Sequence, residues 1–171
     1  LEVDGIAAYE ALRAAAPGAY FDSPEATINA LTIALLPEPG ESILRPGEYL
    51  VRNILAVDPD TGVIAVAAEV EEGQSILFAL REPEAAADDV MRMAERAAAE
   101  APVGGYRFGL YFNCLARGRS LYGRDGVDSA ALARHLPGVP LLGFSCNAEL
   151  APLRGAHYLF TYTGVLVLLS D

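Results

Sequence analysis

The chain has 171 residues, which is enough for one domain with a full hydrophobic core, and 53% of its residues are hydrophobic, too many for a disordered segment. Its formal net charge of −11 argues against a surface for nucleic acid or for an anionic membrane, because both need clustered basic residues. All 12 residues counted as Lys or Arg are arginines, so the chain offers neither a Schiff-base lysine nor a P-loop lysine.

The first half of the chain predicts two short helices followed by strands. We expect Asp4 to cap the first helix and Ser23-Pro24 to open the second. A short buried strand is expected at residues 31–36, and the Pro-, Gly- and Glu-rich stretch 37–47 predicts a surface loop. Three further strands are expected at Tyr49–Val57, Val63–Val70 and Gln74–Leu80. The short turns between them predict an antiparallel meander over about residues 49–80.

The second half alternates strands with helices. A helix is predicted from Glu84 to Ala101, a strand from Tyr106 to Phe112, a helix capped by Asp128, and a strand from Pro140 to Cys146. The apolar run from Tyr158 to Leu169 is too short to span a bilayer and indicates a last buried strand. Together these elements predict a single α+β domain over residues 1–171, with a mixed β-sheet and helices packed on it.

The strand-helix-strand unit over about residues 106–146 carries the most useful functional inference. A helical crossover normally joins parallel strands, whose carboxyl ends then lie at one edge of the sheet, where ligands of open α/β sheets tend to bind. The loops that leave these two strands contain the candidate ligand-binding residues Asn113, Cys114, Arg117, Arg119, Cys146, Asn147 and Glu149.

The side chains of these loops favour recognition of a zwitterion. Arginine forks match carboxylates, and Glu149 offers a partner for an ammonium group, so an amino acid or a similar organic anion is the ligand that we expect. The alternative is that the arginines form ion pairs with acidic residues of the chain itself.

Catalysis by Cys114 or Cys146 needs a nearby base, and neither His135 nor His157 stands at a recognisable spacing from them. We therefore predict no catalytic residue and no enzyme. The same cysteines and histidines lack zinc-site spacing, so we expect no metal and no cofactor. A disulfide between Cys114 and Cys146 stays open as an alternative, although two cysteines indicate a reducing cytoplasm.

Two segments resemble signature motifs of one protein family. Residues 113–123 (NCLARGRSLYG) and 142–152 (LGFSCNAELAP) are similar to the two signature loops of the FIST C domain, and residues 162–166 (YTGVL) resemble its closing strand. The resemblance covers roughly residues 46–171. It adds Gly118 and, on an earlier strand, Arg52 to the candidate ligand-binding residues. Three positions depart from the pattern: Ala148 and Ala151 replace glycines, and Phe160 stands where a histidine is common.

The resemblance implies a bacterial, cytoplasmic sensory domain of a signal-transduction protein that binds small ligands such as amino acids. It also implies an N-terminal FIST domain in the same protein, which would explain why the chain starts at Leu1. A second implied role is protein recognition, since a branch of the family occurs in substrate receptors of ubiquitin ligases. The sequence does not predict an oligomeric state.

Overall fold

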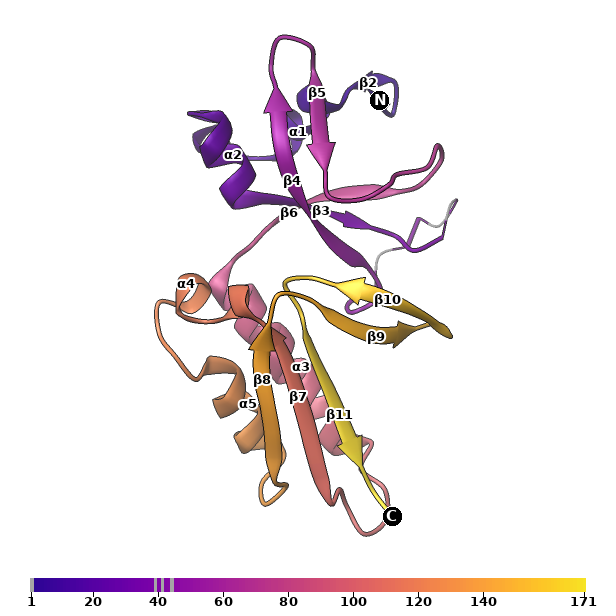
Figure 1. Cartoon of the computed structure of the whole chain (residues 1–171), viewed down its shortest axis with the longest axis vertical. Helices are drawn as coiled ribbons and strands as arrows, with labels where there is room; N and C mark the ends of the chain where they lie inside the picture. The colour runs from indigo at the N-terminus through magenta and orange to yellow at the C-terminus, as the bar shows by residue number, and fades with distance from the viewer. Residues whose placement is uncertain (1, 39, 41, 44) are drawn as a thin grey trace. The chain divides into compact units, whose positions relative to one another are not determined.

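The computed structural model describes residues 2–38, 40, 42–43 and 45–171. Residue 1 and three positions of the expected loop at 37–47 (residues 39, 41 and 44) lie outside the described residues. The chain divides into two compact units, residues 1–81 and residues 82–171 (Figure 1). The elements have the α+β composition that the sequence predicts.

The first unit combines short helices with a sheet. Its elements are β1 (Glu2–Val3), β2 (Ile6–Ala7), α1 (Ala8–Ala15), the 3-10 helix η1 (Gly18–Phe21), α2 (Pro24–Ala30), β3 (Leu31–Leu35), β4 (Leu50–Asp58), β5 (Val63–Val66) and β6 (Ile76–Leu80). The predicted start of α2 is confirmed, because the Ser23 hydroxyl accepts a hydrogen bond from the Ala26 N–H at 3.1 Å. Every residue of β3 is buried, as expected for the strand at 31–36.

The prediction that Asp4 caps the first helix is wrong. Asp4 and Gly5 have φ values of 52° and 80° and form the turn between β1 and β2, which pair antiparallel. The helix therefore begins at Ala8. Aspartate tolerates a left-handed conformation, so the same residue type is typical both of this turn and of a helix cap.

The sheet of the first unit is antiparallel, but its strand order corrects the predicted meander. The order is β5-β4-β3-β6, so β6 pairs with β3 and not with β5. β5 ends at Val66, four residues before the predicted end at Val70. Residues 67–75 connect it to β6, which lies on the far side of β3. The fully apolar β3 is buried because it has a strand on each side.

The second unit consists of a three-stranded sheet, two longer helices and a hairpin (Figure 1). Its elements are α3 (Pro83–Ala99), β7 (Phe108–Cys114), η2 (Leu115–Arg117), α4 (Arg119–Tyr122), α5 (Val127–His135), β8 (Leu141–Cys146), β9 (Glu149–Leu153), β10 (Ala156–Phe160) and β11 (Gly164–Leu169). The sheet has the order β11-β7-β8, and β9 pairs with β10 in the separate hairpin.

β7 and β8 run parallel, which confirms the topology predicted from the strand-helix-strand pattern. Their register sets Asn113 beside Ser145 and Cys114 beside Cys146, so both strands end at the same level. The helices α3 and α5 lie together against one face of this sheet. The core there is built on Ala94, Leu132 and Leu136, with Tyr111 and side chains of β8 and β11 packed around it.

The opposite face of this sheet is apolar and uncovered along β8. The side chains of Leu142 and Phe144 are 73% and 65% exposed, and Phe144 makes an edge-to-face contact with Phe112 at 5.2 Å between ring centroids. Strands alternate their side chains between the two faces, so the face without helices carries Phe112, Leu142 and Phe144.

Two expectations for this unit need correction. The apolar run from Tyr158 to Leu169 is not one strand, because the chain turns at Tyr162, which has φ 62°, and divides the run between β10 and β11. Asp128 does not cap α5 either. Gly126 holds that position, and Asp128 lies inside the first turn with its side chain buried.

Candidate functional site

The carboxyl ends of β7 and β8 bring four of the predicted residues together. The Ser145 hydroxyl donates to Oδ1 of Asn113 at 2.8 Å, and the Cys146 Sγ lies 3.7 Å from the Asn113 carbonyl oxygen. The Cys114 Sγ lies 3.9 Å from the carbonyl oxygen of Asn147. We call Asn113, Cys114, Cys146, Asn147 and Glu149 the rim. Cys114 and Glu149 are buried, Asn113 and Cys146 are half-buried, and Asn147 is exposed.

Glu149 is the most unusual residue of the rim. It begins β9 and is 4% exposed, yet the partners of its carboxylate among the described residues are neutral. Oε2 accepts a hydrogen bond from the Thr163 hydroxyl at 3.0 Å, and Oε1 lies 3.4 Å from the Cys146 Sγ. Phe160 stands directly opposite Glu149 in the hairpin and offers no charge. Among the described residues Glu149 forms no ion pair, although buried carboxylates are normally paired with a cation.

Thr163 belongs to this site, although no local sequence pattern indicates it. Its carbonyl oxygen accepts a hydrogen bond from the Cys114 N–H at 2.9 Å, so the turn before β11 is anchored on the end of β7. Its hydroxyl is thereby directed at Glu149. Thr163 lies within the apolar run that we expected to form one buried strand, and only the turn at Tyr162 reveals its role.

The Arg117 side chain is buried in an ion pair with Asp128. Its Nε donates to Oδ2 of Asp128 at 2.9 Å and its Nη2 to Oδ1 at 3.2 Å, and both side chains are less than a tenth exposed. Nη2 also donates to the Ala86 carbonyl oxygen on α3 and lies 2.8 Å from the Tyr122 hydroxyl. Arg117 therefore joins η2, α3 and α5, and its fork is directed at the protein's own carboxylate.

Two tyrosine hydroxyls complete the shell around Asp128. Tyr111 donates to Oδ2 and Tyr122 to Oδ1, each at 2.8 Å. Burial by itself raises the pKa of Asp128, but the hydrogen bonds and charge of Arg117 outweigh it and hold the pKa below its usual value. Burial and the nearby Asp128 carboxylate raise the pKa of both tyrosines, so the hydroxyls stay protonated and act as donors.

Sequence reasoning missed Asp128, Tyr111 and Tyr122. Asp128 was interpreted as a helix cap, which its position at the start of α5 favours equally well. The available signal was Gly164, because a Cβ at that position would lie 2.2 Å from the Tyr111 hydroxyl. The glycine leaves room for the Tyr111 ring on its way to Asp128. Identifying that close approach requires the pairing of β11 with β7.

Three other predicted residues lie outside the rim contacts. Arg119 is exposed and forms an ion pair with Asp125, the acid that follows the basic loop. Gly118 links η2 to α4, and its carbonyl oxygen accepts the N–H of Leu121 at 3.0 Å. Arg52 belongs to the first unit, where it lies on β4 opposite Ile33 of β3. Its Nη1 donates to the Val51 carbonyl oxygen at 2.8 Å.

The departures from the expected glycine pattern cause no backbone strain. Neither Ala148 nor Ala151 has a positive φ, so alanine fits both positions without a conformational cost.

The hydrogen-bond partners described for Cys114 and Cys146 include no imidazole: His135 lies near Glu95 of α3, and His157 is exposed on β10. Within residues 2–38, 40, 42–43 and 45–171, no three His, Cys, Asp or Glu side chains are grouped as metal ligands. No helix in this part of the chain is long and apolar enough to cross a bilayer.

The Glu149 carboxylate should make the Cys146 thiol less reactive. Partial burial raises the pKa of Cys146, and the hydrogen bond and negative charge of Glu149 raise it further. We expect Glu149→Gln to speed alkylation of Cys146 by iodoacetamide near neutral pH, measured by peptide mass spectrometry across a pH series. Glu100→Gln, which removes an exposed carboxylate at the end of α3, is the matched control. An identical pH profile in Glu149→Gln and the wild type would contradict the described contact.

Comparison with known proteins places these motifs in a family. The profile of the FIST C domain matches residues 8–152, so it starts nearer the N-terminus than the quoted motifs and ends within β9. The uncharacterized protein Rv0628c of Mycobacterium tuberculosis is 34% identical over 150 residues, which are 88% of this chain and 39% of that protein. The uncharacterized protein Mb0898c of Mycobacterium bovis is 34% identical over 125 residues, 73% of this chain and 32% of that protein. The chain thus spans less than half the length of these curated relatives.

Proposed function

The chain belongs to the FIST C domain family, which is generally linked to sensing and signal transduction, and from this premise we propose that it binds an amino acid or a similar small ligand at the rim. In this proposal the ligand's ammonium group pairs with Glu149. Its carboxylate meets the side-chain amides of Asn113 and Asn147. No residue is assigned a catalytic role, and no metal or cofactor is involved.

The observation that supports the proposal is the buried Glu149 carboxylate with neutral partners only. A buried carboxylate gains most from a partner that brings a positive charge and further hydrogen-bond donors. Thr163 and Cys146 fix the Glu149 carboxylate in place without neutralising it. Asn113 supports this arrangement, because its Oδ1 accepts from Ser145 and its amide N–H₂ remains as a donor.

Arg117 takes a positioning role in this proposal. Its guanidinium is paired with Asp128, and it ties η2, which directly follows Cys114, to α3 and α5. The loop after β7 is therefore held by a buried ion pair while the rim binds the ligand. Gly118, Arg119 and Arg52 remain candidates that the proposal does not require.

A thermal-shift screen with amino acids and their deaminated analogues tests this function. An amino acid that binds should raise the melting temperature, by linkage between binding and folding, and its deaminated analogue should not. Glu149→Gln keeps the hydrogen-bonded shape but removes the charge, so we expect it to abolish the shift. Glu100→Gln should retain it. A shift that survives in Glu149→Gln would rule out the ammonium partner.

The competing function is protein recognition, and the uncovered apolar side chains of Leu142 and Phe144 favour it. Large exposed apolar patches commonly mark interaction sites. If no small molecule stabilises the chain and a protein partner binds it, with binding lost in Phe144→Ser, the recognition role replaces the ligand-binding role. The small-molecule screen and the partner-binding assay of Phe144→Ser together decide between the two.

We also propose that the chain forms the C-terminal part of a longer bacterial, cytoplasmic protein with an N-terminal FIST domain. The support is that the chain covers 39% and 32% of two mycobacterial relatives, so those proteins contain substantial further sequence. Ligand binding at the rim would then be transmitted through that further sequence.

A further inference from the structure

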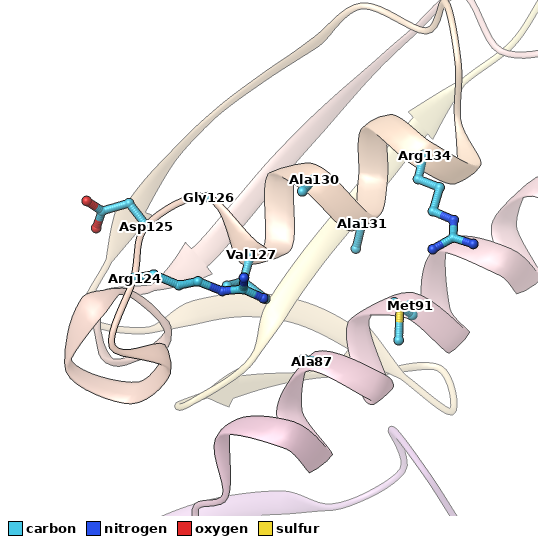
Figure 2. A pocket seen from close by; sticks show the side chains of 9 residues that line it. All are labelled: Ala87, Met91, Arg124, Asp125, Gly126, Val127, Ala130, Ala131 and Arg134. Atoms are coloured by element: carbon cyan, nitrogen blue, oxygen red, sulfur yellow. The ribbon is translucent and has the colours of Figure 1, made fainter.

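A depression lies in the second unit, and its lining includes none of the rim residues. It has a volume of about 360 Å³ and lies between α3 and the segment that leads into α5. Figure 2 shows its lining: Ala87 and Met91 come from α3, and Val127, Ala130 and Ala131 come from α5. These five residues give it an apolar floor. Its volume falls within the range of small-molecule sites.

Two arginines border this floor. The side chains of Arg124 and Arg134 extend on the side of α5 that faces α3 (Figure 2). Both residues are exposed, and the ion pairs of the described residues include neither of them. The chain has a formal net charge of −11, and these two arginines bring positive charge to one depression.

The acid in the lining of this site is already paired. Asp125 lines the depression with its backbone, but Figure 2 shows its carboxylate projecting away from the floor, and it forms the ion pair with Arg119. Asp128 is buried with Arg117. No side chain caps the N-terminus of α5 at Gly126, which also lines the depression, so its first-turn amides add to the positive potential.

We propose that this depression, which we call the α3–α5 site, binds an organic carboxylate that has a branched or aromatic apolar body and no amino group. The carboxylate pairs with the guanidinium group of Arg134, which Figure 2 shows directed toward α3, and Arg124 adds positive charge at the other end of the floor. The apolar body covers Ala87, Met91 and Ala130. The lining includes no free carboxylate to receive an ammonium group, so a deaminated acid binds more tightly than the amino acid with the same side chain.

This site is independent of the rim, and it differs in the chemistry that it selects. The rim offers a buried Glu149 to an ammonium group, whereas the α3–α5 site offers two arginines to a carboxylate. The two ligand classes are related as an amino acid is to its deaminated acid. A test with such a pair therefore separates the two sites.

The experiment is an NMR titration of the ¹⁵N-labelled 171-residue chain with 4-methylpentanoate and, separately, with L-leucine. We expect 4-methylpentanoate to cause saturable shifts of the amides of Ala87, Met91, Gly126, Val127 and Ala130. L-leucine should shift these amides less at equal concentration. Arg134→Gln should weaken binding of 4-methylpentanoate roughly tenfold, since it removes the charge-assisted hydrogen bond to the carboxylate, and Arg124→Gln should weaken it less.

Three further variants control the result. Ala130→Glu places a negative charge on the floor at an exposed helix position and should abolish binding without unfolding the chain. Arg107→Gln removes the same charge at the start of β7, where Arg107 pairs with Asp171, and should leave binding unchanged. Glu149→Gln should also leave it unchanged, even if it removes binding at the rim.

The proposal is overturned if 4-methylpentanoate causes no saturable shifts. It is also overturned if the dissociation constant is the same in Arg134→Gln as in the wild type. Shifts confined to Asn113, Asn147 and Glu149, or lost in Glu149→Gln, would assign the binding to the rim and remove the second site.

Discussion

Asp128→Ala should lower the free energy of unfolding by about 3 to 5 kcal/mol, because it leaves the Arg117 guanidinium buried without a counter-charge. The same change removes the acceptor of the Tyr111 and Tyr122 hydroxyls. Urea unfolding followed by circular dichroism measures the loss. Asp125→Ala breaks only the exposed pair with Arg119 and should change stability little.

A double variant separates the charge from the packing. Arg117→Met combined with Asp128→Leu removes both charges, so it should be less destabilising than Asp128→Ala alone. Stability should also depend on pH through Asp128. Its folded pKa lies below the unfolded value, so its contribution is present above the unfolded pKa and is lost as the pH falls through the folded pKa. A double variant as unstable as Asp128→Ala would contradict the buried-charge explanation.

Gly143→Ala should destabilise the chain by about 3 kcal/mol or more, at the upper end of the usual cost of overpacking. A Cβ at Gly143 would lie 1.8 Å from the Tyr111 carbonyl oxygen and 2.8 Å from its carbonyl carbon. Backbone atoms of a paired strand cannot move aside as a flexible side chain can. β7 and β8 would therefore have to separate next to the rim.

Gly18→Ala is the matched control, since nothing lies within 4 Å of a Cβ at Gly18 and its φ is not positive. It should leave stability unchanged or slightly raise it, because alanine restricts the unfolded chain. Urea unfolding of the two variants gives the comparison. If Gly143→Ala were as stable as the wild type, the register of β7 against β8 would be wrong, and the rim would be lost with it.

Local sequence patterns predicted the parts of the fold that depend on nearby residues. The apolar β3, the helix α3 and the Ser23 cap follow from periodicity and end signals within a few residues. The parallel pairing of β7 with β8 followed from the rule for helical crossovers. The pairing of β6 with β3 joins segments that are distant in sequence, and the turn signals around β5 carry no information about it.

The candidate site was predicted only in part, for the same reason. The predicted strand ends and the loops after them gave Asn113, Cys114, Cys146 and Asn147, which lie together at the carboxyl ends of β7 and β8. They did not give the partner of Arg117, because an arginine that binds a ligand and one that binds Asp128 look alike in sequence. Thr163 was hidden in an apolar run, although its hydroxyl completes the environment of Glu149.

A titration of the ¹⁵N-labelled chain with the amino acid that stabilises it most is the sharpest test of ligand binding at the rim. Binding at the rim should cause saturable shifts at the amides of Asn113, Cys114, Cys146, Asn147 and Glu149, and these shifts should be lost in Glu149→Gln while the fold is unchanged. Saturable shifts that avoid these five residues, or that persist in Glu149→Gln, would contradict it.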